Sequence, residues 1–374
     1  MTDFMTYKEA ISYDELYKSM MKCKRNVQWK DSTSNFVLHS VKQISKLSSE
    51  LQNETYIQGE PYLFRVTVPK SRDILSMPFR DRVYQRSLND NILYPVMTKS
   101  FILDNCACQH KKGNQFARQR LVAQLRRMVN KYGANFYILQ IDIHGFYKNL
   151  PHDYINKLFQ EKLDQETYVH VLSILKTQYQ GNKGYNPGSQ MIQIAGIAAL
   201  NKLDHYIKEQ LHVKIYEHYM DDLIVGFQTR EEAIRGKIAI EGELFKIGLE
   251  FNRKKTRIYP VSNGIPFLGF VFTVTKTGKI LEFPLSEKIK NAKRKYKHMI
   301  QYSLPHGNIL VECIEESYRD FRSCISEGNS YYCVQKMDKY YLSLWKGDKK
   351  YEQREIKYIT DLRKAKKRST RCQN

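Results

Sequence analysis

Two adjacent aspartates between apolar segments limit the folds open to this chain more than any other feature. Asp221 and Asp222 follow Ile-Tyr-Glu-His-Tyr-Met at 215–220 and precede Leu-Ile-Val-Gly-Phe at 223–227. The β-branched and aromatic flanks predict two strands joined by a tight acidic turn. Neighbouring carboxylates repel each other, so a fold tolerates them best where a cation compensates. A solvated turn is the plain alternative, and a metal-binding hairpin tip is the functional one.

A third acid ends another apolar segment. Asp142 closes Tyr-Ile-Leu-Gln-Ile-Asp at 137–142, which predicts a compact strand. If that strand lies beside the acidic hairpin, Asp142, Asp221 and Asp222 form an all-oxygen ligand set that suits Mg²⁺ rather than zinc. Two such ions, about 3.5–4 Å apart, would activate a 3′-hydroxyl and stabilise the leaving pyrophosphate in nucleotidyl transfer.

The composition indicates a folded protein that binds a polyanion. Among 374 residues, 61 Lys and Arg face 39 Asp and Glu, which gives a formal charge of +22, and nucleic acid is the commonest polyanion to neutralise such a surplus. A hydrophobic fraction of 42% excludes a disordered basic tail protein. With no apolar run of bilayer length and no signal-peptide pattern, we expect a cytoplasmic protein without a membrane partner.

The seven cysteines are scattered and odd in number, which predicts reduced thiols. Cys106, Cys108 and His110 suggest zinc, but no second ligand pair stands at finger spacing. Hydrophobic periodicity predicts helices and strands in mixed order. We expect short helices within 1–60, a hairpin with a basic tip around 69–73, a strand at 265–272 and helices at 81–97, 151–163, 190–211, 229–247 and 286–300, the last capped by Ser286.

Several segments resemble one family. Tyr-Met-Asp-Asp at 219–222 resembles the catalytic box of reverse transcriptases, and Ile-Asp-Ile-His-Gly-Phe-Tyr-Lys-Asn-Leu-Pro-His at 141–152 resembles their first acidic motif. Other segments are similar, in matching order, to parts of bacterial group II-intron-like enzymes: the fingers (69–73 and 79–88), the template-contacting loop (106–114), the motif after the catalytic box (248–256) and the primer grip (266–270). The resemblance covers about residues 60 to 300.

This resemblance implies an α+β right-hand polymerase fold of fingers, palm and thumb, with an antiparallel palm sheet and a helical thumb. The implied divisions are an N-terminal extension at 1–60, fingers at 61–136, a palm with fingers-derived elements at 137–262, and the primer grip, helical thumb and basic C-terminal tail at 263–374. We expect the tail segment 361–371 to lie on RNA as a basic arm.

The resemblance also implies site roles. Asp142 and Asp221 hold two Mg²⁺ ions, with Asp222 as the weaker partner and Ile143 adding its carbonyl. Further residues are implied to bind the nucleotide: Lys70 and Arg72 at the fingers tip, Tyr147 as the steric gate that implies dNTP use, Lys255 near the pyrophosphate with Lys254 as an open rival, and Pro187, Gly188 and Gln193 in the box at 184–195.

That box departs from the pattern, because Ile192 replaces the expected Ser and Pro187 stands where retroviral enzymes have a Gln that touches the nucleotide. Base selection is then loose, or the site is adapted to an unusual template. Residues implied to bind nucleic acid lie in the template loop, the primer grip and the thumb helix: Lys111, Lys112, Phe267, Leu268, Gly269, Lys290, Lys293, Arg294 and Lys297.

Within the family, the sequence is most similar to reverse transcriptases of the defence-associated unknown group and of diversity-generating retroelements. The resemblance implies an RNA-directed DNA polymerase that makes cDNA from dNTPs on a dedicated structured noncoding RNA in bacterial antiphage defence. Its partners would be that RNA and the cDNA or RNA–DNA duplex, with an accessory protein or homo-oligomer left open. The alternatives are mutagenic cDNA synthesis for diversification and, from another class, a non-catalytic RNA-binding scaffold.

Overall fold

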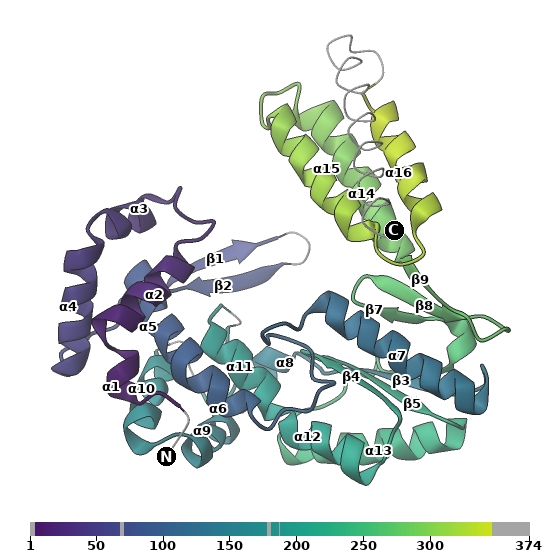
Figure 1. Ribbon diagram of the computed structural model, residues 1–374, viewed down its shortest axis with the longest axis horizontal. Coiled ribbons are helices and arrows are strands. Elements are labelled where there is room, and N and C mark those ends of the chain that lie inside the picture. The colour runs from purple at the N-terminus through teal and green to yellow at the C-terminus, as the bar shows by residue number, and fades with distance from the viewer. Residues whose placement is uncertain (1–3, 68–70, 178–180, 187, 346–374) are drawn as a thin grey trace, which may run out of the picture. The chain divides into compact units, whose positions relative to one another are not determined.

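The computed structural model describes residues 4–67, 71–177, 181–186 and 188–345. The chain divides into two compact units, Met1–Pro260 and Val261–Asn374, and each is described by itself. Helices and antiparallel sheets occur in both units, so the predicted α+β class is confirmed (Figure 1). Within the described ranges, no helix combines the length and the apolar character that crossing a bilayer requires.

Four short helices form an N-terminal layer on α5 (Phe79–Leu88). Apolar residues spaced three or four apart give these helices one buried face, which packs into the same core as the rest of the first unit. Buried hydrogen bonds reinforce the contact, because Ser87 Oγ of α5 donates to the Ala10 carbonyl at 2.6 Å. The layer contains α1 (Tyr7–Ala10), α2 (Tyr13–Cys23), α3 (Asp31–Leu38) and α4 (Ser40–Gln52).

The predicted hairpin and the helix after it are both present. β1 (Tyr62–Val66) pairs antiparallel with β2 (Arg72–Ser76). A continuous helical stretch follows, made of α5, a π-helical turn η1 (Asn89–Leu93) and α6 (Tyr94–Thr98). The irregular turn has a local cause, because Pro95 has no N–H and interrupts the regular ladder of backbone hydrogen bonds.

A four-stranded antiparallel sheet carries the acidic segments. Its strand order is β4-β5-β3-β6, with bounds β4 (Ile215–Tyr219), β5 (Asp222–Phe227), β3 (Tyr137–Asp142) and β6 (Arg257–Pro260). Helix α7 (Asn114–Tyr132) lies along the edge strand β4, where the Gln124 amide bonds both the N–H and the carbonyl of Tyr216, at 2.7 and 3.0 Å. This contact satisfies backbone groups that an open edge would offer to another strand.

Helices pack around this sheet (Figure 1). Helix α13 (Arg230–Lys246) contacts β3, β5 and β6, and Thr229 and Glu232 form the capping box that begins it. The single helix expected at 190–211 is wrong in detail, because α11 ends at Ala199 and a turn at Leu200 (φ −91°, ψ 0°) divides the stretch. The other helices of this region are α8 (Phe146–Asn149), α9 (His152–Lys162), α10 (Gln165–Lys176), α11 (Gln190–Ala199), α12 (Asn201–His205) and the π-helical turn η2 (Tyr206–Gln210).

The second unit begins with a small sheet. The strand expected at 265–272 is in fact a tight hairpin, because Leu268 and Gly269 both adopt left-handed backbone angles (φ 47° and 83°) and reverse the chain. Positive φ at both central residues is the geometry of a two-residue hairpin turn. The elements are a 3₁₀ turn η3 (Val261–Asn263), β7 (Ile265–Phe267), β8 (Phe270–Val274) and β9 (Ile280–Pro284).

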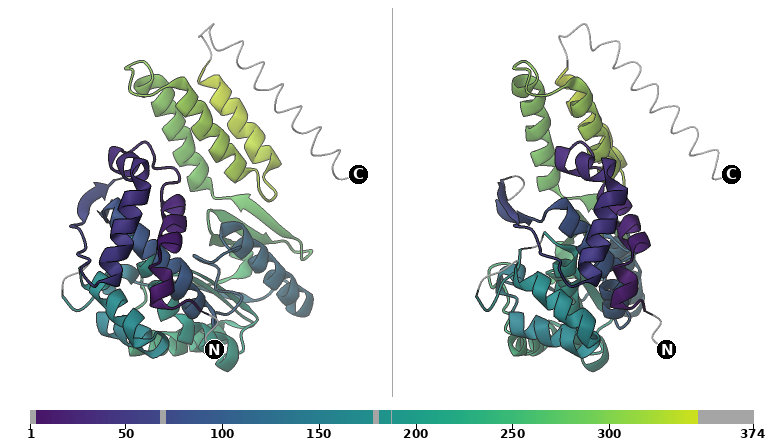
Figure 2. Two further views of the ribbon diagram at one scale, coloured as in Figure 1. Left: turned by 60° about the vertical axis from the view of Figure 1, so that its left-hand side comes forward. Right: turned by 90° about the vertical axis from the view of Figure 1, so that its left-hand side faces the viewer.

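Three helices complete the second unit and lie side by side (Figure 2). Aromatic rings dominate their core, where Tyr318 and Tyr341 stack with ring centroids 3.7 Å apart. Helix α14 begins at Ser286 but Leu285 occupies the N-cap position, so the predicted cap at Ser286 is wrong by one residue. The bounds are α14 (Ser286–His298), a π-helical turn η4 (Met299–Ser303), α15 (Val311–Ile325) and α16 (Tyr331–Ser343).

Candidate active site

The acidic turn is a two-residue hairpin loop. Tyr219 of β4 pairs with Asp222 of β5, which leaves Met220 and Asp221 as the turn. Met220 has a left-handed backbone (φ 60°), a conformation that costs a residue with a side chain roughly 1–2 kcal/mol. Strained backbone of this kind persists only where the surrounding structure holds it, and it concentrates at functional sites.

The fold brings Asp142 to this turn. Asp142 ends β3 and lies directly opposite Asp222 in the antiparallel register. Directly opposed residues project their side chains from the same face of a sheet, with Cβ atoms about 5 Å apart. The next residue ties the two segments together, because the Ile143 N–H donates to the Asp221 carbonyl at 3.3 Å. Asp142, which is far from the acidic pair in sequence, therefore meets Asp221 and Asp222 at one end of the sheet.

A lysine already neutralises part of this charge. Lys255 Nζ lies 2.6 Å from Asp142 Oδ1, and this hydrogen bond raises the pKa of Lys255 above its usual value. The same loop holds the backbone of Asp142, since Asn252 N–H donates to the Asp142 carbonyl at 2.7 Å. The contact distinguishes Lys255 from its sequence rival Lys254, for which the structure records only a backbone hydrogen bond to Asn252.

The carboxylate oxygens of the three aspartates are suitable ligands for Mg²⁺. Carboxylate oxygens are hard ligands of the kind that Mg²⁺ binds, and the ammonium against Asp142 shows that the site attracts a cation. The side chains do not form a ready cage, because no group of three or more His, Cys, Asp or Glu in the described ranges is arranged to hold a metal ion. The suggested zinc residues point elsewhere: Cys106 Sγ is buried 3.4 Å from Glu217 Oε2, and Cys108 is exposed.

The residues predicted to bind the nucleotide have diverse surroundings. The Tyr147 ring lies on α8 beside Gly196 of α11, where an added Cβ would come within 3.1 Å of it. Gly188 meets the β1–β2 hairpin, because a Cβ there would lie 2.5 Å from the Leu75 carbonyl. Its lack of a side chain thus serves a contact with β2. Gln193 Oε1 lies 3.8 Å from Cys108 Sγ, which itself contacts Met220 of the turn.

Of the remaining residues that the sequence singled out for the nucleotide site, the structure describes Arg72 and Ile192. Arg72 is the exposed first residue of β2, and Ile192 is buried in the core of the first unit. Lys70, Pro187 and the tail segment 361–371 lie outside the described residues.

Lys111 and Lys112, the two lysines predicted to contact the template, differ in what they can reach. Lys111 is exposed, with a left-handed backbone. Lys112 instead turns inward and donates to the carbonyls of Leu103 and Asn105 at 3.0 and 2.8 Å. Burial lowers the pKa of Lys112. The Lys112 ammonium therefore holds its own loop, and only Lys111 of this pair presents its charge to solvent.

In the second unit, the predicted primer-grip residues form the β7–β8 hairpin, with Phe267 buried and Leu268 and Gly269 in its turn. On α14, Lys290, Arg294 and Lys297 are exposed at helical spacing. Lys293 differs because its ammonium lies 4.9 Å from the centre of the Tyr340 ring.

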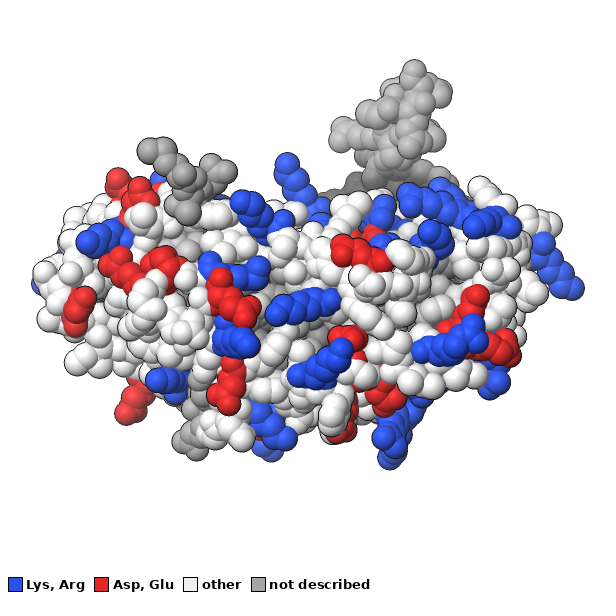
Figure 3. All heavy atoms as spheres, turned by 90° about the horizontal axis from the view of Figure 1, so that it is seen from below, with Lys and Arg blue, Asp and Glu red and all other residues white. Residues whose placement is uncertain are grey.

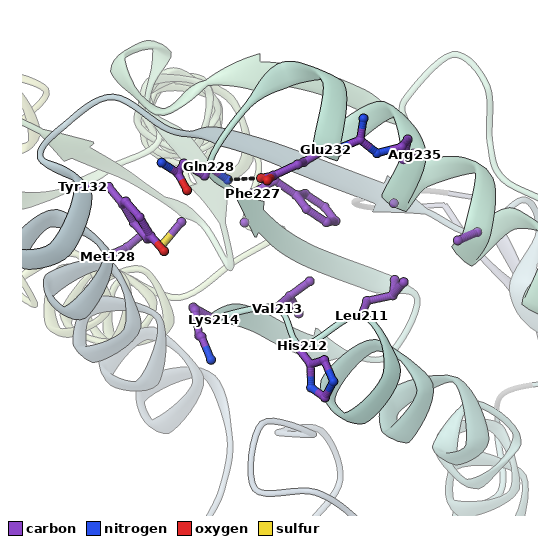
Figure 4. Close-up of a pocket in the computed structure, with 13 residues that line it drawn as sticks. Met128, Tyr132, Leu211, His212, Val213, Lys214, Phe227, Gln228, Glu232 and Arg235 are labelled. Atoms are coloured by element: carbon purple, nitrogen blue, oxygen red, sulfur yellow. Dashed lines mark hydrogen bonds between the residues drawn. The ribbon is translucent and has the colours of Figure 1, made fainter.

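Figure 4 shows the residues that line a hollow of about 430 Å³ at the other end of the β4–β5 hairpin. Met128 and Tyr132 of α7 line one part of it, and Glu232 and Arg235 of α13 line another. Lys214, just before β4, contributes from the end of the hairpin opposite to the acidic turn. Its position separates this hollow from the three aspartates.

Sequence reasoning missed a buried polar network behind the turn. Asp204, Glu217 and His218 are fully buried, and Asp104 and Gln124 nearly so. Their side chains bond one another and the backbone of β4. A signal existed, because Glu217 and His218 interrupt an otherwise apolar and aromatic strand pattern.

The fold is the right-hand α+β fold of template-directed polymerases. Residues 70–272 match the family model described as reverse transcriptase (RNA-dependent DNA polymerase). The match covers more than half of the chain, so the chain belongs to this family. No curated protein matches the sequence.

Two solved structures are similar to this chain. One is apo telomerase from Candida tropicalis truncated from its C-terminal domain, with 12% identity, a TM-score of 0.44 and coverage of 65% of this chain and 60% of that one. The other is telomerase from Candida albicans in complex with a TWJ fragment of telomeric RNA, with 11% identity, a TM-score of 0.47 and coverage of 79% and 61%. The chain thus spans about three fifths of the length of these solved chains.

Proposed function

We propose that this chain is an RNA-directed DNA polymerase that builds cDNA from dNTPs. The observation that carries the proposal is the pairing of Asp142 with Asp222 beside the strained turn that presents Asp221. Three carboxylates at the end of an antiparallel sheet suit in-line nucleotidyl transfer, in which charge develops on both the attacking and the leaving oxygen. A retained but inactive fold gives no physical reason to keep this mutually repelling set.

In this proposal, Asp142 and Asp221 hold two Mg²⁺ ions, with Asp222 as the weaker partner and the Ile143 carbonyl as a further oxygen. Bound magnesium supplies the positive charge that activates a 3′-hydroxyl and neutralises the leaving pyrophosphate. We assign Lys255 to the pyrophosphate because its ammonium already lies at the carboxylates. We assign Tyr147 to exclusion of the ribose 2′-hydroxyl, and Arg72 to the triphosphate because its guanidinium suits bidentate phosphate contact.

The biological setting is part of the proposal. The likeness of the motifs to group II-intron-like enzymes favours a bacterial retroelement enzyme that copies a structured noncoding RNA in the cytoplasm during antiphage defence. The formal charge of +22 and the exposed lysines of α14 support a polyanionic partner. Diversification is the competing role, and Ile192 in the place of a polar residue is the feature that favours it. Sequencing of copied cDNA separates the two, since diversification predicts frequent mismatches.

The activity is tested with the full chain, an RNA template, a DNA primer and labelled dNTPs. Asp221→Asn keeps the shape of the side chain and removes its charge. We expect incorporation to fall by at least about a thousandfold, equivalent to roughly 4 kcal/mol. The matched control is Asp153→Asn, an exposed aspartate in the first turn of α9, which should leave incorporation unchanged. Equal activity of both variants would refute the catalytic assignment and favour the RNA-binding scaffold.

A further inference from the structure

A buried histidine stands directly behind the acidic turn. His218 of β4 is fully buried, and its ring lies between two acceptors. Nδ1 is 3.0 Å from Asp204 Oδ2, and Nε2 is 2.8 Å from the carbonyl oxygen of Met220. Asp204 belongs to α12 and is also fully buried. The ring therefore links a helix of the core to the central residue of the turn.

The partners of this ring define what each nitrogen does. The Met220 carbonyl can only accept, so Nε2 carries a hydrogen. Nδ1 faces Asp204, whose two oxygens also contact the Tyr216 hydroxyl and the Asn105 amide, the latter at 3.1 Å. Burial lowers the pKa of His218, but the charge of Asp204 and its hydrogen bond outweigh burial and raise that pKa. The raised pKa favours the form in which both ring nitrogens donate.

The backbone of His218 is held as firmly as its side chain. Its N–H donates to the Asp104 carbonyl at 3.0 Å, and its carbonyl accepts from the Cys106 N–H at 2.9 Å. Residues 104–106 thereby extend the sheet beyond the edge strand β4, in parallel at Asn105. Neither the main chain nor the ring of His218 is free to shift without breaking buried hydrogen bonds, which are costly to leave unmade.

The acidic turn at Met220 and Asp221 requires a residue that holds its backbone in place. Met220 has left-handed angles without being glycine, and the orientation of its peptide group decides where Asp221 points. A hydrogen bond to the Met220 carbonyl restrains that orientation. When protonated, the ring also places a positive charge behind two adjacent carboxylates, which offsets part of their repulsion.

We propose that His218, anchored by Asp204, is a positioning residue for the acidic turn: it fixes the Met220 carbonyl and with it the direction of Asp221 and Asp222. This inference rests on the proposed polymerase function. Removing the contact should slow the chemical step more than it weakens substrate binding, because the ring touches neither template nor nucleotide.

The activity test compares two substitutions of His218. His218→Phe keeps a ring and removes both donors, and we expect kcat to fall about 10- to 100-fold with KM for dNTP within about threefold. His218→Gln keeps one N–H donor near the Nε2 position and should recover part of the lost kcat. The matched control is Ser87→Ala, which breaks a buried hydrogen bond to Ala10 in the N-terminal layer. It should lower the melting temperature and leave kcat unchanged.

A folded His218→Phe enzyme with kcat within twofold of the unaltered chain would overturn the proposal. Should that variant not fold, ¹⁵N-histidine NMR of the unaltered chain decides. We expect one histidine, assigned by its absence from His218→Gln, whose Nε2 carries a proton at neutral pH; an unprotonated Nε2 at this position would overturn the arrangement. The NMR result does not depend on polymerisation, so it stands apart from failure of the proposed activity.

Discussion

The Tyr147 hydroxyl is buried and has no hydrogen-bond partner among the described residues. An unsatisfied buried polar group costs about 1–3 kcal/mol, whereas the aromatic ring supplies the bulk that a steric gate needs. We therefore expect Tyr147→Phe to raise the free energy of unfolding by about 1 kcal/mol and to keep rejecting ribonucleotides. Urea unfolding and rNTP incorporation measure the two effects. Tyr7→Phe is the opposite control, since the Tyr7 hydroxyl lies 2.9 Å from that of Tyr84 and should lose stability.

Glu217 makes stability depend on pH. Burial and the nearby Asp104 raise the pKa of Glu217 well above its usual value, so the folded protein holds this proton to a higher pH than the unfolded chain does. The unfolded chain releases its proton above about pH 4.3, and folding stability is therefore lost as pH rises. Glu217→Gln removes that loss, so its stability advantage should grow between pH 5 and pH 8, by up to about 1.4 kcal/mol per unit.

Thermal unfolding of Glu217→Gln and of the unaltered chain across that pH range measures how their stability difference changes. The exposed Glu161→Gln serves as the control and should show no such change. A Glu217→Gln curve parallel to that of the unaltered chain would mean that Glu217 is already ionised in the folded state.

At the scale of elements, α13 sits on the sheet through a glycine. A Cβ at Gly236 would lie 2.2 Å from the Phe227 ring, so Gly236→Ala forces the helix or the ring to move. Overpacking of this kind costs about 1–3 kcal/mol. Gly242 lies in the same helix with nothing within 4 Å of an added Cβ. Gly242→Ala should therefore stabilise by about 0.5–1 kcal/mol through helix propensity. Urea unfolding of the two variants should give changes in the free energy of unfolding with opposite signs. Equal changes would contradict the close contact at Gly236.

The elements also show how far sequence patterns reach. Sequence patterns located the acidic hairpin through its apolar flanks, α9 through its apolar face, and α13 through the capping residues Thr229 and Glu232, although Ile238 and Phe245 of α13 are exposed. They did not locate the turn at Leu268 and Gly269, since the run 265–272 is apolar throughout and only a left-handed leucine reverses it. The sequence also gives no sign of the break at Leu200, because neither Gly nor Pro stands where α11 ends.

For the whole molecule, the order of the motifs along the chain and the positive charge indicated a nucleic-acid polymerase. The position of Asp142 beside the acidic turn followed from the predicted pairing of their strands. What stayed hidden is the use of polar groups inside the fold. Lys112 and Lys293 look like ordinary members of basic runs, yet one holds loop carbonyls and the other lies over the Tyr340 ring. Charge counts cannot separate these from exposed neighbours, because packing from distant segments decides which ammonium is free.

The difference between exposed and engaged cations on α14 predicts how nucleic-acid binding responds to salt. If the total charge of +22 alone governed binding, neighbouring substitutions on α14 would act alike. On the face that Figure 3 shows, acidic side chains lie among the basic ones, so the surplus charge is not spread evenly. Each phosphate contact adds about 0.9 to the slope of log K against log salt. Arg294→Gln, on the exposed face, should lower that slope by about one.

Lys293→Gln should change the slope less and the melting temperature more, because it removes the cation over Tyr340. Filter binding of an RNA–DNA duplex from 50 to 200 mM salt measures both variants. Equal slope changes would assign binding to net charge instead of to a defined helix face.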